Sequence, residues 1–87
     1  MNHHHRKTLH ALFAHPLSAN IDFNETVNLL RELGADVEDK SGNRIGVKLK
    51  GHSVALPHAH HDLPKEEVIK VRKLLEECGV DPLNYPL

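Results

Sequence analysis

The sequence predicts one α+β domain with the order helix, three strands, helix, in which a three-stranded antiparallel sheet carries both helices on one face. Apolar residues recur at helical spacing over residues 23–33 and again over residues 65–78. Between these segments, apolar and polar residues alternate over residues 35–56, and two glycine-containing turns interrupt the alternation. The chain has 87 residues, which suffices for one domain with one hydrophobic core.

Composition limits the partners and the compartment that we expect. The chain carries 11 Lys and Arg residues against 12 Asp and Glu residues, so its overall charge neither requires nor excludes a nucleic-acid partner. A single cysteine rules out an intramolecular disulfide and suits a reducing compartment. No apolar run approaches the roughly 20 residues that span a bilayer, and no signal-peptide pattern opens the chain. We therefore expect a cytoplasmic protein without a membrane partner.

Residues 1–21 are expected to form an N-terminal arm that lies on the domain. Leu9, Leu12 and Phe13 could form the apolar side of a short helical turn. Pro16 would stop this turn, because its ring disfavours the helical conformation of the preceding residue. The histidines His3–His5 fit either the remnant of an affinity tag or a native segment, and we leave them out of the predicted site.

The first helix is predicted over residues 23–33, at the start of a domain that covers residues 22–80. Asp22 is a good N-cap, and Glu25 three residues later completes a capping-box pattern. Gly34 follows the last apolar residue, at a position where many helices end in a left-handed conformation.

Three short strands joined by tight turns are predicted next. The segments ADVEDK, RIGVKLK and HSVALP each alternate apolar and polar residues. Gly42, in the sequence SGN, and Gly51 can take the positive φ angles that tight turns need. Pro57 ends the third strand, because it has no N–H to donate to the sheet.

The second helix is predicted from the segment PKEEVIKVRKLLEECG. Pro64 suits the first turn, and two glutamates follow it at the positive end of the helix dipole. Cys78 falls on the apolar side of this helix, so we interpret it as a buried structural thiol and not as a nucleophile. Gly79 ends the helix, and residues 81–87 are expected to form a tail.

The predicted sheet has one covered face and one open face. Both helices carry a single apolar stripe, so both should pack on the same face. That face holds Ile45, Val47, Leu49, Val54 and Leu56. The opposite face would hold Lys40, Arg44, Lys48 and Lys50. We interpret these four basic side chains as candidate RNA contacts through phosphate groups; the alternative is an ordinary solvated face.

The order of the elements and several short motifs resemble a known family. The α-β-β-β-α order is that of double-stranded-RNA-binding domains. Within it, a helix ends in LLRELGA, a GNR turn enters the second strand, the third strand ends in LPHAH, and the last helix opens at LPK and closes with GV. This combination covers about two-thirds of the chain and resembles the HicA toxins of bacterial and archaeal toxin–antitoxin pairs. The segment KTLHALFAHPLSANI, residues 7–21, looks like the extension that a subset of HicA-like proteins carries.

The resemblance implies the toxin component of a type II toxin–antitoxin system, a metal-independent endoribonuclease that binds and cleaves mRNA. It also implies a HicB-like antitoxin protein as partner and no cofactor. In HicA toxins the catalytic histidine stands in the turn at the start of the second strand. This chain has Gly42, Asn43 and Arg44 there, so that Arg44 replaces the expected histidine.

This replacement changes the chemistry that the turn can supply. RNA cleavage without a metal needs a base for the 2′-hydroxyl proton and an acid for the leaving oxygen, and an imidazole with a pKa near 6.5 can serve as either. A guanidinium stays protonated, so Arg44 could stabilise negative charge but could not be the base. His58 and His60 are the candidate catalytic residues for proton transfer, because a meander would bring the end of the third strand beside the start of the second.

Three other interpretations stay open. The loss of the expected histidine also fits a catalytically inactive module that binds RNA or only a HicB-like protein. A small metal-binding protein is the second alternative, because five possible zinc ligands occur near one another: His52, His58, His60, His61 and Asp62. Their spacing matches no strong zinc motif, and we assign no metal ligand. An open edge of the sheet could also pair with a second copy to form a homodimer.

Overall fold

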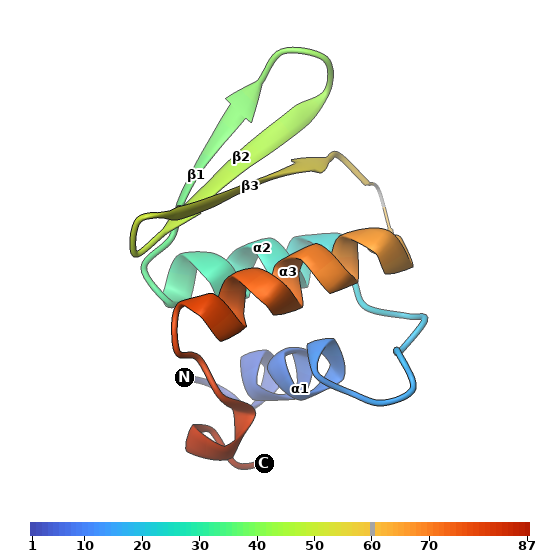
Figure 1. Ribbon diagram of the computed structural model, residues 1–87. Helices are drawn as coiled ribbons and strands as arrows, with labels where there is room; N and C mark the ends of the chain where they lie inside the picture. Colours follow the sequence, from blue (N-terminus) through green and yellow to red (C-terminus); the bar gives the residue numbers. More distant parts are fainter. Residues whose placement is uncertain (60) are drawn as a thin grey trace.

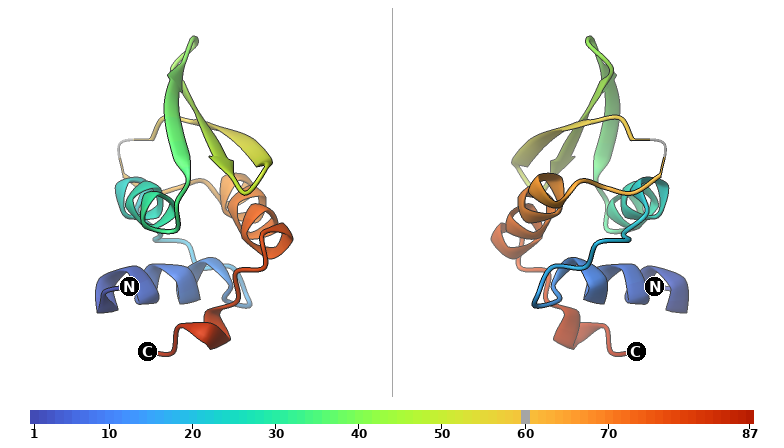
Figure 2. Two further views of the ribbon diagram at one scale, coloured as in Figure 1. Left: turned by 90° about the vertical axis from the view of Figure 1, so that its left-hand side faces the viewer. Right: turned by 90° about the vertical axis from the view of Figure 1, so that its right-hand side faces the viewer.

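The computed structural model describes residues 1–59 and 61–87 and has an α+β fold built in three layers. The helices over these residues are α1 (His3–Leu12), α2 (Phe23–Glu32), α3 (Lys65–Glu77) and a short 3₁₀ helix, η1 (Pro82–Asn84). The strands are β1 (Asp36–Lys40), β2 (Arg44–Leu49) and β3 (His52–Pro57). The sheet lies at the top of Figure 1, α2 and α3 lie side by side beneath it, and α1 and the short helix η1 lie below them. Both views in Figure 2 show the same order of layers.

The strands form an antiparallel meander in the order β1-β2-β3, as predicted. Val47 in the central strand pairs with Val37 on one side and with Val54 on the other. In the β1–β2 turn, Gly42 and Asn43 have φ angles of 77° and 60°, which glycine and asparagine adopt more readily than other residues. The first turn therefore uses the glycine that the sequence pattern assigned to it.

One face of the sheet packs on α2 and α3. Its four most buried side chains are each at most 3% exposed, whereas Val54 on the edge strand is half-buried. These four side chains are Ile45, Val47, Leu49 and Leu56. They belong to one core together with the apolar sides of the two helices. The prediction that both of these helices cover the same face of the sheet is confirmed.

The ends of α2 follow the signals in its sequence. Asp22 Oδ2 accepts a hydrogen bond from the backbone N–H of Glu25 at 2.9 Å, which makes Asp22 the N-cap. Gly34 takes a φ of 100° after the helix. The helix ends at Glu32, one residue before the predicted end.

Residues 1–21 were expected to form an arm, but they contain a complete helix that belongs to the core. Leu9 and Leu12 on α1 are both 0% exposed. Arg72 of α3 donates hydrogen bonds from Nε to the carbonyl of Leu12 and from Nη2 to that of Ala14, both at 2.8 Å. Thus α1 is a third helix beyond the two predicted, and it covers the side of α2 and α3 that faces away from the sheet.

The first turn of α1 contains the histidines that were left out of the predicted site. Asn2 caps the helix by accepting a hydrogen bond from the backbone N–H of His5 at 2.8 Å. His4 Nε2 lies 2.9 Å from Glu25 Oε2, and His5 Nδ1 lies 2.6 Å from Glu32 Oε1. The hydrogen bond from His5 lowers the pKa of Glu32 below its ordinary value of 4.5; partial burial opposes this effect, and the charges of His5 and the N-terminal amine add to it. These two histidines therefore link α1 to α2.

The segment predicted as a tail folds back on α1. His10 Nε2 lies 2.9 Å from the carbonyl oxygen of Tyr85, and Arg6 Nη1 donates to the carbonyl of Pro86 at 3.4 Å. Both chain termini consequently lie on the α1 side of the molecule (Figure 1). None of the helices within the described residues is both long enough and apolar enough to cross a bilayer.

Candidate functional site

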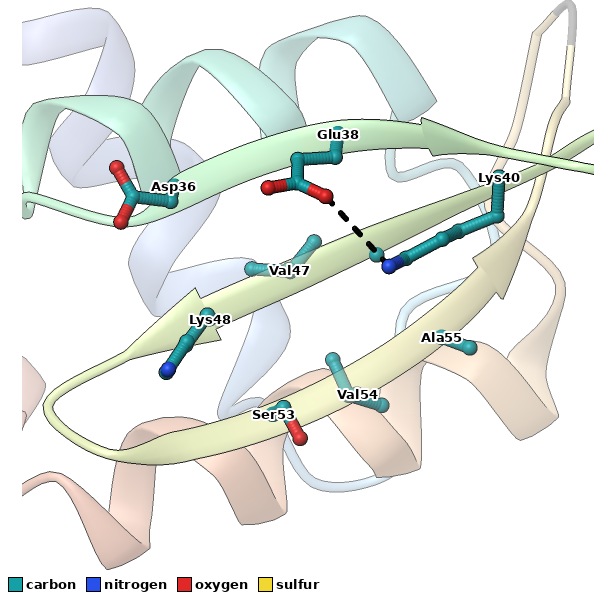
Figure 3. A pocket seen from close by; sticks show the side chains of 9 residues that line it. Asp36, Glu38, Lys40, Val47, Lys48, Ser53, Val54 and Ala55 are labelled. Carbon is teal, nitrogen blue, oxygen red and sulfur yellow. Dashed lines mark ion pairs between the residues drawn. The ribbon is translucent and has the colours of Figure 1, made fainter.

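The open face of the sheet holds three of the four predicted basic side chains. Lys40 and Lys48 are exposed and lie on either side of a shallow hollow of about 590 Å³ (Figure 3). Arg44 is exposed on the same face, because it lies four residues before Lys48 on β2 and side chains alternate along a strand. The small residues in this region of the sheet are Gly46, Ser53 and Ala55.

Acidic side chains share this open face, which the sequence interpretation did not include. Asp36 lies opposite Lys48 in the strand register, and Glu38 lies opposite Gly46. Lys40 reaches across Gly46, where an added Cβ would come within 2.6 Å of its Cε, and its Nζ is 3.5 Å from Glu38 Oε2 (Figure 3). The open face is therefore a patch of mixed charge, and its attraction for a phosphate backbone is weaker than four cations alone would give.

The fourth predicted basic residue, Lys50, lies away from this face. Strand β2 ends at Leu49, and Lys50 stands in the following turn with a φ of 49°. Its Nζ is 3.5 Å from the carbonyl oxygen of Cys78, just beyond the end of α3. The positive φ breaks the alternation from which its position on the open face was predicted.

The meander brings His58 to the start of β2. Arg44 pairs with Pro57 in the strand register, and the backbone N–H of His58 donates to the carbonyl of Asn43 at 3.0 Å. The expectation that the end of the third strand lies beside the GNR turn is thus confirmed for the backbone.

The imidazole of His58 lies on the helix side of the sheet. Its ring centroid is 5.7 Å from that of Phe23 on α2, at an interplanar angle of 42°. Its Nε2 is 3.4 Å from Oδ1 of Asp39, at the long end of the hydrogen-bond range. Arg44 is on the open face, so His58 and Arg44 are neighbours along the backbone but use different faces of the sheet.

His58 and Asp39 border a small recess between α2 and the sheet, which we call the His58 recess. Its volume is about 170 Å³. Its apolar lining is Phe23, Val27, Val37 and Ile45, and its polar lining is Asn24, Asn28, Arg31, Asp39 and His58. The apolar lining is buried or half-buried, whereas all five polar residues are exposed. The recess therefore has an apolar floor and a polar rim.

In the His58 recess, His58 could transfer a proton near the positive charge of Arg31. The contact with Asp39 engages Nε2 of His58, so the other ring nitrogen, Nδ1, is the one that could accept or give a proton. The carboxylate of Asp39 can orient the ring through this contact. Arg31 lines the same recess, and a guanidinium is suited to bind phosphate oxygens.

The remaining histidines of the LPHAHHD segment do not extend this group. His60 lies outside the described residues. The carbonyl of His61 accepts a hydrogen bond from the backbone N–H of Phe23 at 2.8 Å, and Asp62 forms an isolated bridge with Asp22. His52 is at the other end of β3, with Nδ1 3.9 Å from a carboxylate oxygen of Glu77. Across residues 1–59 and 61–87, no three His, Cys, Asp or Glu side chains are grouped to hold a metal ion.

The sequence interpretation missed most of the rim. Asn24, Asn28 and Arg31 recur at intervals of four and three residues, which on a helix surface is typical of any solvated side. Asp39 offered a clearer signal, because strand alternation puts it on the same face as Val37, toward the helices. Its side chain is nevertheless 90% exposed and needs no polar partner, so the contact with His58 at 3.4 Å is evident only from the folded structure.

Comparison of the chain with protein-family models, with curated proteins and with solved structures gave no significant match.

Proposed function

We propose that this protein is an RNA-directed, HicA-like toxin that cleaves its RNA without a metal, and that His58 transfers the proton. The observation that carries the proposal is the position of His58. Its backbone is bonded to Asn43 of the GNR turn, and its imidazole contacts the carboxylate of Asp39. The resemblance to HicA toxins puts a catalytic histidine in that turn. In this chain the backbone of a histidine that follows the neighbouring strand lies beside this turn, with its imidazole on the helix side of the sheet.

The proposed reaction uses groups of this chain alone. His58 Nδ1 would accept the proton of a 2′-hydroxyl while the 2′-oxygen forms a bond to the adjacent phosphorus. The bond from phosphorus to the 5′-oxygen breaks, and this oxygen takes a proton from water. Asp39 would accept a hydrogen bond from Nε2 and so keep Nδ1 free to accept the proton. Arg31 would offset the negative charge that develops on the phosphate oxygens.

The architecture is compatible with an RNA partner. A three-stranded antiparallel sheet with α2 and α3 on one face has the element order of a double-stranded-RNA-binding domain, a fold that contacts phosphates and 2′-hydroxyls. In this proposal Lys40, Arg44 and Lys48 would contact phosphates further along the RNA, because they lie on the face of the sheet opposite the His58 imidazole. Lys50 would reach RNA only from the β2–β3 turn.

A second function is favoured by the charges of the open face. Asp36 opposite Lys48, and Glu38 beside Lys40, provide paired charges of both signs, which suit a protein surface better than a polyphosphate. The corresponding proposal is a catalytically inactive module whose open face binds a HicB-like protein.

Cleavage assays on the purified full chain distinguish the two proposals. Labelled single-stranded and structured RNAs are incubated at neutral pH in the presence of EDTA, and we expect cleavage. His58→Ala should reduce the rate by about 100-fold or more, since general acid–base groups contribute roughly 10²–10⁴-fold. His52→Ala, at the other end of the same strand, is the matched control and should cleave at the wild-type rate. Thermal midpoints of both variants report on folding.

Each outcome of these assays supports or excludes one of the two proposals. Wild-type cleavage that His58→Ala leaves intact would rule out His58 as the proton-transfer residue. Binding without cleavage would favour the inactive module. Binding through phosphates should also weaken with salt, and Lys48→Glu should lower the slope of log affinity against log salt by about 0.7 or more for a single strand. An affinity independent of salt would contradict the phosphate contacts.

A further inference from the structure

The shape of the His58 recess limits what it can hold. Its volume of about 170 Å³ is well below the roughly 300–1,000 Å³ of pockets for drug-sized ligands. Phe23, Val27 and Ile45 form its floor and are each at most 7% exposed, so the floor offers little open apolar surface, and the 42% exposed ring of His58 is the face on which a base can stack. The half-exposed ring of His58 stands beside this floor, tilted against Phe23. A recess of this kind fits one planar aromatic ring.

Two amide side chains line the same recess. Asn24 and Asn28 lie one turn apart on α2, about 6 Å along the helix axis, and both are exposed. An asparagine amide presents one acceptor and a pair of donors in a single plane, and this pattern pairs with the edge of a nucleobase. Arg31 one turn further on adds a charge that can bind a phosphate attached to the same nucleotide. The polar rim thus offers partners for both the base and the phosphate of one nucleotide.

A paired base cannot use these groups. In double-stranded RNA the Watson–Crick edges are occupied, and the deep, narrow major groove keeps side chains away from the other edges. Stacking of a base on the His58 ring also requires a base that has left its own stack.

We infer that the His58 recess takes a single unpaired nucleobase, that the RNA substrate is therefore single-stranded at this position, and that Asn24 and Asn28 determine which base is accepted. This inference rests on the proposed function, since it assigns the substrate class of the same site. It makes Asn24 and Asn28 specificity-determining residues, whereas His58 carries the chemistry.

Binding measurements on the full chain test this inference apart from cleavage. Fluorescein-labelled strands of adenylate, cytidylate and uridylate, with 2′-fluoro groups in place of the attacking hydroxyl, are titrated by fluorescence anisotropy. The duplex of the adenylate and uridylate strands serves as the paired probe. We expect at least one single strand to bind about 10-fold tighter than the duplex and than another single strand. The double variant Asn24→Ala/Asn28→Ala should remove most of the difference between bases and keep the salt slope of the wild type. Asn84→Ala, an exposed asparagine in η1 on the α1 side, is the matched control.

The outcomes separate this inference from the function on which it rests. A chain that binds neither single strands nor the duplex would overturn both. A chain that binds RNA but prefers the duplex, or whose base preference survives in the double variant, would overturn the inference and leave an RNA-directed function in place. Alanine is a better helix former than asparagine, so the double variant is expected to fold, and its circular dichroism spectrum checks this.

Discussion

Replacement of Leu12 by alanine tests whether α1 is part of the core. Leu12 is 0% exposed, and the carbonyl of the same residue accepts a hydrogen bond from Arg72 of α3. Truncation of a fully buried leucine removes apolar contacts and leaves a cavity, at a cost of about 2–5 kcal/mol. A chain of 87 residues has a free energy of unfolding of roughly 4–13 kcal/mol at typical values per residue. Leu12→Ala should therefore remove a large part of the stability of the whole protein.

Urea denaturation followed by circular dichroism measures this effect. With a slope near 1 kcal/mol/M, typical of a small protein, the midpoint of Leu12→Ala should fall by about 2 M or more. Leu12→Met conserves volume and should lower the free energy of unfolding by less than about 1.5 kcal/mol. This variant should therefore still give a measurable unfolding transition if the alanine variant does not fold. Leu83→Ala, at a position that is 83% exposed, is the control and should stay within about 0.5 kcal/mol of wild type. Equal midpoints for Leu12→Ala and Leu83→Ala would show that α1 does not share the core.

Three further outcomes are expected. Arg72→Met removes two charge-assisted hydrogen bonds to carbonyls at the end of α1. It should lower the free energy of unfolding, measured in urea, by about 1.5–3 kcal/mol or more. A change below about 0.5 kcal/mol would contradict this expectation. His5 holds the pKa of Glu32 below 4.5, so the contribution of this pair to stability is present above about pH 4.5 and is lost as the pH falls further. In Glu32→Gln the thermal midpoint should therefore depend less on pH below about pH 4.5 than in the wild type. The same dependence in both proteins would refute the contact. Gly46→Ala should change stability by less than about 1 kcal/mol, because its Cβ meets only the flexible end of Lys40, and a double-mutant cycle with Lys40→Ala should show coupling between the two positions.

Elements with local signals could be predicted from the sequence. Asp22, Glu25 and Gly34 mark the ends of α2 through their own caps, which involve residues only a few positions apart. The three strands mostly alternate apolar and polar residues, with Asp39 as an exception, and glycines mark their turns, so their order and the face covered by α2 and α3 followed as well. The alternation did not predict the position of Lys50, because this residue has a positive φ and its side chain points toward the end of α3 and not to the open face.

Features made by distant segments could not be predicted. Over residues 3–12 only Leu9 and Leu12 gave an apolar pattern, which is too short to indicate a helix; their burial depends on α2 and α3, and tertiary packing supplies most helix stability. The His58 recess likewise forms only when α2, the end of β1 and the end of β3 come together. His58 was identified, but its partner Asp39 became evident only from the contact between two strands that do not pair with each other.

The position of the chain termini has a practical consequence for the experiments. Arg6 contacts Pro86, and both termini lie on the α1 side, with α2 and α3 between them and the sheet (Figure 2). A fluorophore, a fusion partner or a linker to a sensor chip attached at either end would thus project away from the strands. Immobilisation through either terminus would orient the molecules with the strands outward, so that binding of RNA or of a protein can be measured without a steric block by the attachment.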